Sequence, residues 1–256
     1  MVPRVEVKAG VGVVLALCVG AGHASAADPV SLHDFLFGGH SSTSDAQPTI
    51  AKYKADGGEG FVFDRTSGRG ALIKYDDSSE IWALTATPGP RGDVIYKNDM
   101  GQPVLRATRL GGLTLFTADY PGGTAAAAAG LAAAPRPPPI LGPEALLRVL
   151  LQAGARATRA AQHLVYFDAG DANVSPSTES VFADCFGLAA DAIVQVSGQG
   201  RAGQMVVGRL VKVRFIQGPA PNAMVIGSTV QIVVAPQMGL AGRPSSKRIA
   251  AAIFRR

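Results

Sequence analysis

Three carboxylates stand close together in the segment Asp76-Asp77-Ser78-Ser79-Glu80. Two carboxyl groups held near one another can act as general acid and as base or nucleophile, as in glycoside hydrolysis. The same residue types also favour a hairpin turn, where a cation would bind only weakly. The segment therefore leaves two alternatives open, a turn or the carboxylate pair of a hydrolase.

A glycine pattern resembles a nucleotide-binding loop by its letters alone. Gly198, Gly200 and Gly203 have the spacing of the dinucleotide fingerprint. That mechanism needs a strand before the glycines, a helix after them and an acidic residue about 20 positions on. Here the glycines follow an expected helix and precede an expected strand, and no acidic residue occurs after Asp191. We interpret the segment as a loop and predict no cofactor.

The first ligand positions of a calcium-binding loop are present, but the later required positions are not. Asp171, Asn173 and Ser175 have the right spacing, but Pro176 stands where the loop needs glycine and Phe182 where it needs glutamate. We interpret this segment as a helix-capping turn and predict no metal ligands.

Histidine is scarce, and none of it forms a recognisable triad. After the first 27 residues only His33, His40 and His163 remain, and only His163 lies in a segment with a structural pattern. A hydrolytic triad needs a nucleophile, a base and an orienting acid together, and no GxSxG elbow occurs. We therefore predict no catalytic residues, and the protein is more simply explained as a non-enzyme.

The clearest chemical feature is charge asymmetry. The chain carries a formal net charge of +5, and residues 192–256 contain basic residues but no acid. Such a segment produces a positive field, unless it is a solvated face or is neutralised within a dimer or a domain contact. The candidate residues for an anionic partner are Arg148, Arg156, Arg159, Lys212, Arg214, Arg243, Lys247 and Arg248.

The N-terminal residues predict export. Arg4 and Lys8 precede an uncharged apolar stretch over residues 9–22, and small residues follow at 24–26. This order is typical of a cleavable signal peptide, and the stretch is short for a membrane-spanning helix. We expect residues 1–27 to be removed by cleavage near Ala26-Ala27, which leaves a periplasmic or secreted protein without a transmembrane anchor. Cys185 is then the only cysteine, which excludes an intramolecular disulfide.

Turn-rich alternation predicts an antiparallel β-meander over residues 60–120, after an irregular lead-in over 28–59. We expect its strands at 61–64, 71–75, 81–87, 94–97, 104–109 and 113–117. An Ala- and Pro-rich stretch over 121–142 predicts a semi-rigid linker. Its composition marks the best boundary in the chain.

Residues 143–256 predict a basic α+β region. Pro143 and Glu144 suit the start of one helix, and Ser175-Pro176 the start of a second. The second helix is expected to bury an apolar stripe of Val181, Cys185, Leu188, Ala192 and Val196. Two strands, 205–216 and 224–234, are expected to form a β-hairpin, and a short helix over 245–256 ends the chain. The predicted fold class is therefore α+β: a meander, a Pro/Ala linker, and a helical pair with a hairpin.

Several motifs resemble a known family. They include Ile73-Lys74-Tyr75-Asp76-Asp77-Ser78-Ser79-Glu80-Ile81-Trp82, Gly89-Pro90-Arg91-Gly92-Asp93 and Gly242-Arg243-Pro244-Ser245-Ser246. Together with Phe63-Asp64-Arg65 and the segment 101–112, they resemble uncharacterised alphaproteobacterial secreted proteins that share domain of unknown function 4908. The resemblance covers most of residues 60–256 and implies a shared fold and compartment. It supplies no activity and no site residues.

These observations favour a non-enzymatic binding or structural accessory protein of the cell envelope. The expected partner is an anionic envelope component: a lipid headgroup, lipopolysaccharide or an acidic protein. Nucleic acid is not expected in that compartment. The alternative from a different class is an envelope-acting hydrolase that uses paired carboxylates among Asp76, Asp77 and Glu80.

Overall fold

The protein is described by a computed structural model that covers residues 48–66, 70–137, 139, 142–170 and 172–255. The predicted signal peptide, most of the expected lead-in with His33 and His40, Asp171 and Arg256 lie outside these residues. Residues 46–256 form one compact unit.

The first half of this unit is a closed antiparallel barrel whose neighbouring strands follow one another in the sequence. Its strands are β1 (Ile50–Ala55), β2 (Gly60–Asp64), β3 (Gly70–Tyr75), β4 (Ile81–Pro88), β5 (Val94–Lys97), β6 (Pro103–Ala107), β7 (Leu113–Leu115) and β8 (Thr124–Leu131). A short 3-10 turn, η1 (Pro90–Gly92), joins β4 to β5. The six strands expected from the sequence are confirmed as β2 to β7.

Two further strands convert the expected meander into a barrel. β1 pairs with both β2 and β8, which closes the sheet and removes its free edges. β1 lies in the expected lead-in over 28–59 and β8 in the expected linker over 121–142. Both of those expectations were wrong there, because the sheet begins before residue 60 and ends after residue 120. In β1, Ala51, Tyr53 and Ala55 point into the core while Lys52 and Lys54 point to solvent.

The barrel core is aromatic and aliphatic. Tyr53 stacks on Phe61 with ring centroids 5.6 Å apart, and Phe63 meets Tyr96 edge-on at 5.0 Å. The largest fully buried side chains of this core are those of Tyr53, Phe61, Phe63, Ile73, Leu105 and Leu115. Inward-facing residues therefore fill the barrel from every side.

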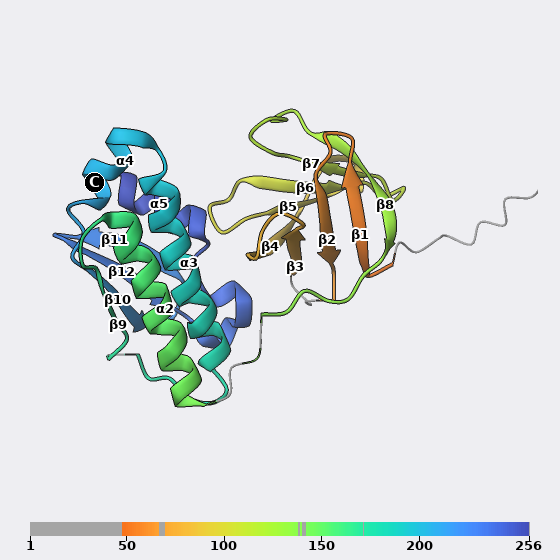
Figure 1. Cartoon of the computed structure of the whole chain (residues 1–256). Coiled ribbons are helices and arrows are strands. Elements are labelled where there is room, and N and C mark those ends of the chain that lie inside the picture. Colours follow the sequence, from red (N-terminus) through yellow and green to blue (C-terminus); the bar gives the residue numbers. More distant parts are fainter. Residues whose placement is uncertain (1–47, 67–69, 138, 140–141, 171, 256) are drawn as a thin grey trace, which may run out of the picture. The chain divides into compact units, whose positions relative to one another are not determined.

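The second half is a mixed sheet with helices on one face (Figure 1). Its elements are α2 (Pro143–Ala161), β9 (Tyr166–Asp168), α3 (Glu179–Ser197), α4 (Gly200–Val207), β10 (Lys212–Gln217), β11 (Asn222–Ile226), β12 (Thr229–Val234), η2 (Pro236–Gly242) and α5 (Ser246–Phe254). The strand order is β11-β12-β10-β9. The mixed helix and strand content confirms the α+β expectation at this level.

The hairpin of this region differs from the expected one. β11 and β12 form it, and they turn at Gly227, whose φ of +61° suits glycine. β10 instead runs parallel to β12 and β9. The expected strand at 205–216 begins only at Lys212, because residues up to Val207 belong to α4.

α3 is the central helix of the second core. Val181, Cys185, Leu188, Ala192 and Val196 form the apolar stripe predicted for this helix, and all are buried. By length and composition α3 could also cross a membrane, but here most of it packs inside the protein. Burial raises the pKa of the Cys185 thiol to about 12, so this thiol stays protonated.

Candidate functional site

Two barrel turns meet the N-terminus of α5. In an up-and-down barrel every second turn lies at the same end, so the β3–β4 and β5–β6 turns are neighbours. They carry Glu80 and Asp99. At this end of the barrel, both carboxylates face the segment that begins α5.

Each of these carboxylates binds the first residues of α5. Glu80 Oε1 accepts from the backbone N–H of Ser246 at 3.0 Å, and the Ser246 hydroxyl donates to Glu80 Oε2. Asp99 accepts from the backbone N–H and the hydroxyl of Ser245, both at 2.8 Å. The N-terminus of a helix favours negative charge, and hydrogen bonds to carboxylates are stronger than neutral ones. The two barrel carboxylates therefore anchor α5.

Arg243 makes a second anchor next to the first. Arg243 is 3% exposed as a residue. Its guanidinium pairs with Asp184 of α3 and donates to the Ile81 carbonyl oxygen of β4 at 2.6 Å. A Cβ at the preceding Gly242 would lie 1.9 Å from the carbonyl oxygen of Ala235, so only glycine lets the chain pass here. The segment Gly242-Arg243-Pro244-Ser245-Ser246, which is part of the sequence resemblance, thus forms the contact between the barrel and the helical layer.

Burial dominates the electrostatics of this junction. It raises the pKa of the Glu80 carboxyl, against the hydrogen bonds from Ser246 and the positive charge of Arg243. Burial likewise raises the pKa of Asp184, against the charge of Arg243. Both carboxylates are costly to ionise away from water, and their partners offset that cost.

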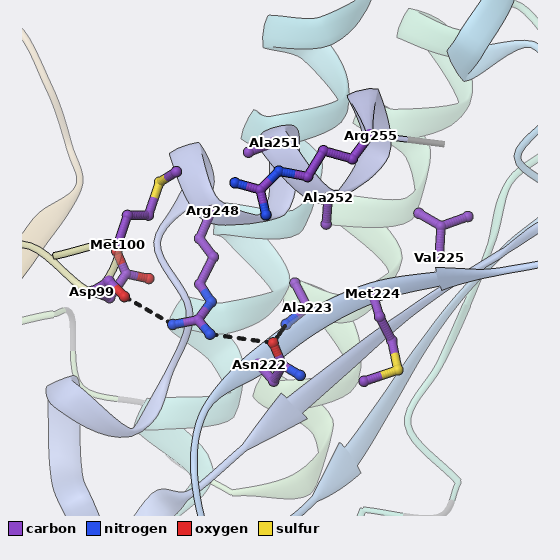
Figure 2. Close-up of a pocket in the computed structure, with 10 residues that line it drawn as sticks. All are labelled: Asp99, Met100, Asn222, Ala223, Met224, Val225, Arg248, Ala251, Ala252 and Arg255. Carbon is purple, nitrogen blue, oxygen red and sulfur yellow. Dashed lines mark hydrogen bonds between the residues drawn. The ribbon is translucent and has the colours of Figure 1, made fainter. Parts of the chain in front are cut away.

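A cavity of about 500 Å³ opens beside this junction, between α5 and β11 (Figure 2). Figure 2 shows Arg248 between Asp99 and Asn222, donating to the Asp99 carbonyl oxygen at 2.9 Å and to Asn222 Oδ1 at 3.2 Å. Arg255 extends from the far end of α5 over the same cavity.

The rest of this cavity's wall is largely apolar. It is formed by Met100, Ala223, Met224, Val225, Ala251 and Ala252. No residue that the structure describes pairs with the Arg255 side chain, which is exposed. We call this cavity the α5 pocket; its wall contains Arg248 and Arg255 from the last helix and its C-terminus, Met100 from the β5–β6 turn and Met224 from β11. A cavity with two cations and an apolar wall can hold an anionic group that carries an apolar part.

The structure separates the predicted basic residues into two groups. In the first group, each side chain has a partner inside the protein. Lys212 pairs with Asp168 at 2.6 Å. The hydrogen bond from Lys212 lowers the pKa of the Asp168 carboxyl below its usual range, and the positive charge of Arg214 also contributes. Arg156 pairs with Asp191 of α3.

The second group consists of exposed cations. Arg148 and Arg159 lie on the outer face of α2, and Lys247 lies on the first turn of α5. Within the described chain none of the three has an ion-pair partner. Arg248 is half-buried in the α5 pocket, and Arg243 belongs to the anchor. The candidates are therefore spread over several surfaces, and only Lys247, Arg248 and Arg243 cluster at the junction.

Two of the three acidic candidates are engaged by other groups, and the third is exposed. Asp76 pairs with Lys52 at 2.8 Å, Asp77 is exposed in the turn, and Glu80 binds Ser246. A smaller cavity of about 260 Å³ is lined by Glu80 and by Asp184 and Asp191 of α3. There Arg243 pairs with Asp184 and Arg156 with Asp191.

The other motifs have structural roles in the described residues. Gly200 begins α4 rather than a loop, and a Cβ at Gly203 would lie 1.9 Å from the Val196 carbonyl oxygen, so this glycine permits close helix packing. Both ring nitrogens of His163 contact backbone carbonyl oxygens, of Ala161 at 2.9 Å and of Leu210 at 2.5 Å. Among the residues described, no cluster of side chains could hold a metal ion.

Sequence reasoning missed the residues that complete the α5 pocket. Arg255 belongs to the basic segment 192–256 but is not among the candidate residues, and Met100, Asn222 and Met224 have no sequence pattern that marks a site. They come from a barrel turn, a strand and the last helix, so no local spacing could bring them together.

Comparison with known proteins places the chain in one family. The model of the family described as a domain of unknown function, DUF4908, matches residues 31–253, and the chain belongs to this family. The resemblance drawn from the sequence motifs is confirmed to that extent. No curated protein and no solved structure matches the chain.

Proposed function

We propose that this member of the DUF4908 family is an exported, non-enzymatic binding protein of the cell envelope. Its α5 pocket holds the anionic headgroup of an amphipathic envelope molecule, such as an acidic lipid. The signal-peptide pattern supports the compartment, and the positive C-terminal segment supports an anionic partner.

The observation that carries the proposal is the composition of the α5 pocket. Arg248 and Arg255 are seven residues apart on α5, about two helical turns, and both reach the same cavity. Met100 and Met224 supply adaptable apolar surface beside them. An inorganic anion would leave that apolar wall unused, and an uncharged lipid would leave Arg255 without a partner. An amphipathic anion uses both.

Arg248 is well placed to start such a site. Its bonds to the Asp99 carbonyl oxygen and to Asn222 hold the guanidinium in position before any ligand arrives. A guanidinium has five N–H donors, so these two bonds leave others for a phosphate or carboxylate. Because the fold already holds the Arg248 guanidinium in place, a ligand does not have to order this side chain, and less of the binding free energy is lost.

The alternative, a hydrolase, is favoured by one observation. Glu80 and Asp184 have raised pKa values and line the same small cavity. However, Glu80 accepts a hydrogen bond from the N-terminus of α5, and Asp184 forms an ion pair with Arg243. General acid–base work requires a carboxyl group that can reach a substrate, so the binding protein is preferred.

Two experiments test the proposal. N-terminal sequencing of protein from the envelope fraction should give a start at Ala27 or Asp28, and recovery of intact Met1 from the cytosol would end the export part. Co-sedimentation at low salt should show mature protein on phosphatidylglycerol vesicles but not on phosphatidylcholine vesicles. Equal behaviour on both vesicle types would contradict the lipid-binding part.

A further inference from the structure

A second cavity, of about 480 Å³, lies at the same end of the barrel but has different walls. Three aromatic residues line it: Tyr75 at the end of β3, Trp82 near the start of β4, and Phe116 just after β7. None of the three is fully buried. We call this cavity the barrel-end pocket. Pockets of 300 to 1,000 Å³ at the mouths of barrels are common ligand sites.

The sheet register explains why two of the rings gather there. Trp82 is the cross-strand partner of the core residue Ile73, and Tyr75 that of the core residue Phe61. Directly opposed residues point to the same side of a sheet, so both rings belong to the inward face at the barrel's end. Their centroids are 6.0 Å apart and their planes meet at 80°, which forms two walls of a corner.

Polar groups line the rest of this pocket. Asn98 is buried and is held in place, because its Oδ1 accepts from the N–H groups of Met100 and Gln102. Asn98 Nδ2 donates to Gln102 Oε1 at 3.2 Å, which leaves the Gln102 amide nitrogen as a donor on an exposed side chain. Burial, with the nearby Glu59 and Asp77, raises the pKa of Tyr75 to about 12, so its hydroxyl stays a donor.

One cation completes this pocket. Lys247 comes from α5 and lines it, while the next residue, Arg248, lines the α5 pocket. Lys247 is exposed and has no ion-pair partner within the described chain. Its neighbour Ser246 is bonded to Glu80, so the backbone that carries Lys247 is fixed relative to the barrel.

We infer that the barrel-end pocket binds an acidic saccharide, with a sugar ring against Tyr75 and Trp82 and its carboxylate at Lys247. A pyranose ring has an apolar C–H face that suits an aromatic wall and hydroxyl groups at its rim that suit amide donors. A purely apolar ligand would leave the amide and ammonium groups without partners, which costs free energy. A simple anion would gain nothing from the rings. This site is separate from the α5 pocket and does not depend on it.

Trp82 makes the inference directly testable, because it is the only tryptophan in the chain. Its fluorescence can be followed while uronic-acid trisaccharides from pectin and alginate digests are added to protein that lacks residues 1–27, with maltotriose as the neutral control. We expect a saturable change in emission with at least one acidic saccharide and a weaker one with maltotriose.

Two matched variants test whether the ammonium group of Lys247 binds the carboxylate of the saccharide. Lys247→Gln should weaken binding of the acidic saccharide about tenfold and leave the maltotriose response unchanged. Arg255→Gln, which alters only the α5 pocket, should change neither. Both residues are exposed, so unchanged thermal unfolding should show that the variants fold.

Two results would overturn the inference. One is constant Trp82 emission, with no heat of binding by calorimetry, up to about 10 mM of every acidic saccharide. The other is equal affinity for acidic and neutral saccharides in wild type and in Lys247→Gln, which would remove the role of the carboxylate. Either result leaves lipid binding by the α5 pocket to be judged by its own experiment.

Discussion

The Ser245 hydroxyl donates a hydrogen bond of 2.8 Å to Asp99 Oδ1, across 146 residues of sequence. The same serine hydroxyl oxygen accepts from the backbone N–H of Arg248 at 3.1 Å and so caps α5. One side chain therefore starts the last helix and ties it to the barrel. Because Lys247 and Arg248 follow directly, this contact also sets where both pockets receive their cations.

Asp99→Ala should loosen this junction. The change removes the acceptor of two hydrogen bonds and leaves the Ser245 N–H without its partner. We expect a loss of about 1–3 kcal/mol in the free energy of unfolding, measured by urea denaturation. Asp119→Ala, an exposed carboxylate in the β7–β8 turn, is the control and should cost less than about 0.5 kcal/mol. Equal losses of unfolding free energy in both variants would show that the Asp99–Ser245 hydrogen bonds do not stabilise the junction.

Arg243→Ala should be the most destabilising single change in the junction. It would leave Asp184 buried without its cation and the Ile81 carbonyl oxygen without its donor. Breaking one side of a buried ion pair costs about 3–5 kcal/mol. Arg156→Ala breaks the half-exposed pair with Asp191 and should cost at most about 1 kcal/mol. If thermal and urea unfolding rank the two variants in the opposite order, the buried anchor is not what holds the junction.

The raised pKa of Glu80 predicts a pH dependence with a definite sign. A carboxyl whose pKa is higher in the folded state than its ordinary value of 4.5 binds more protons when folded. Its contribution to stability is therefore present below that ordinary value and is lost as pH rises through the folded pKa.

Glu80→Gln should remove this loss, so the free energy of unfolding of the variant should rise relative to that of wild type as the pH increases above about 4.5. Urea unfolding at several pH values measures the difference. Asp76→Asn, in the exposed pair with Lys52, serves as the control. A steeper fall in Glu80→Gln than in wild type would show that the sign is wrong.

The alanine-rich segments offer an internal control for barrel closure. Residues 125–129 belong to β8 and are bonded to β1 and β7, whereas 132–134 follow the strand and have no regular structure. Elastase cleaves after alanine, so it should cut at 132–134 before 125–129, because paired strands resist proteolysis. Mass spectrometry of the first fragments distinguishes the two. First cuts inside 125–129 would mean that β8 does not close the barrel.

The same alanines show why part of the fold could not be predicted. Strand patterns rely on alternation between apolar and polar residues, and a run of alanines has none, so β8 resembled a linker. β1 did alternate, in Ala51, Tyr53 and Ala55 against Lys52 and Lys54, but it was short and stood beside a polar segment. By contrast, β2 to β7 and the core stripe of α3 carried strong local patterns and were predicted correctly.

The site was harder to predict than the fold for a related reason. Basic residues could be counted, but their partners could not be known: Asp168 neutralises Lys212 from a neighbouring strand, and Asp184 neutralises Arg243 from α3. Glu80 was one of three carboxylates considered for the alternative hydrolase, and nothing near it in sequence indicates Ser246, 166 residues away. Long-range pairing of charges becomes visible only in the folded chain.

The anion site in the α5 pocket is tested most directly by calorimetry of dodecyl phosphate, below its micelle concentration, with protein that lacks residues 1–27. The α5 pocket predicts one saturable site that weakens as salt rises, because exposed charges are screened within about 10 Å at 0.1 M ionic strength. Arg255→Gln should weaken it about tenfold and Met224→Gln should also weaken it, whereas the exposed Arg209→Gln should bind like wild type. Binding that is absent, or that falls equally in Arg209→Gln and Arg255→Gln, would contradict the assignment of the α5 pocket as the anion site.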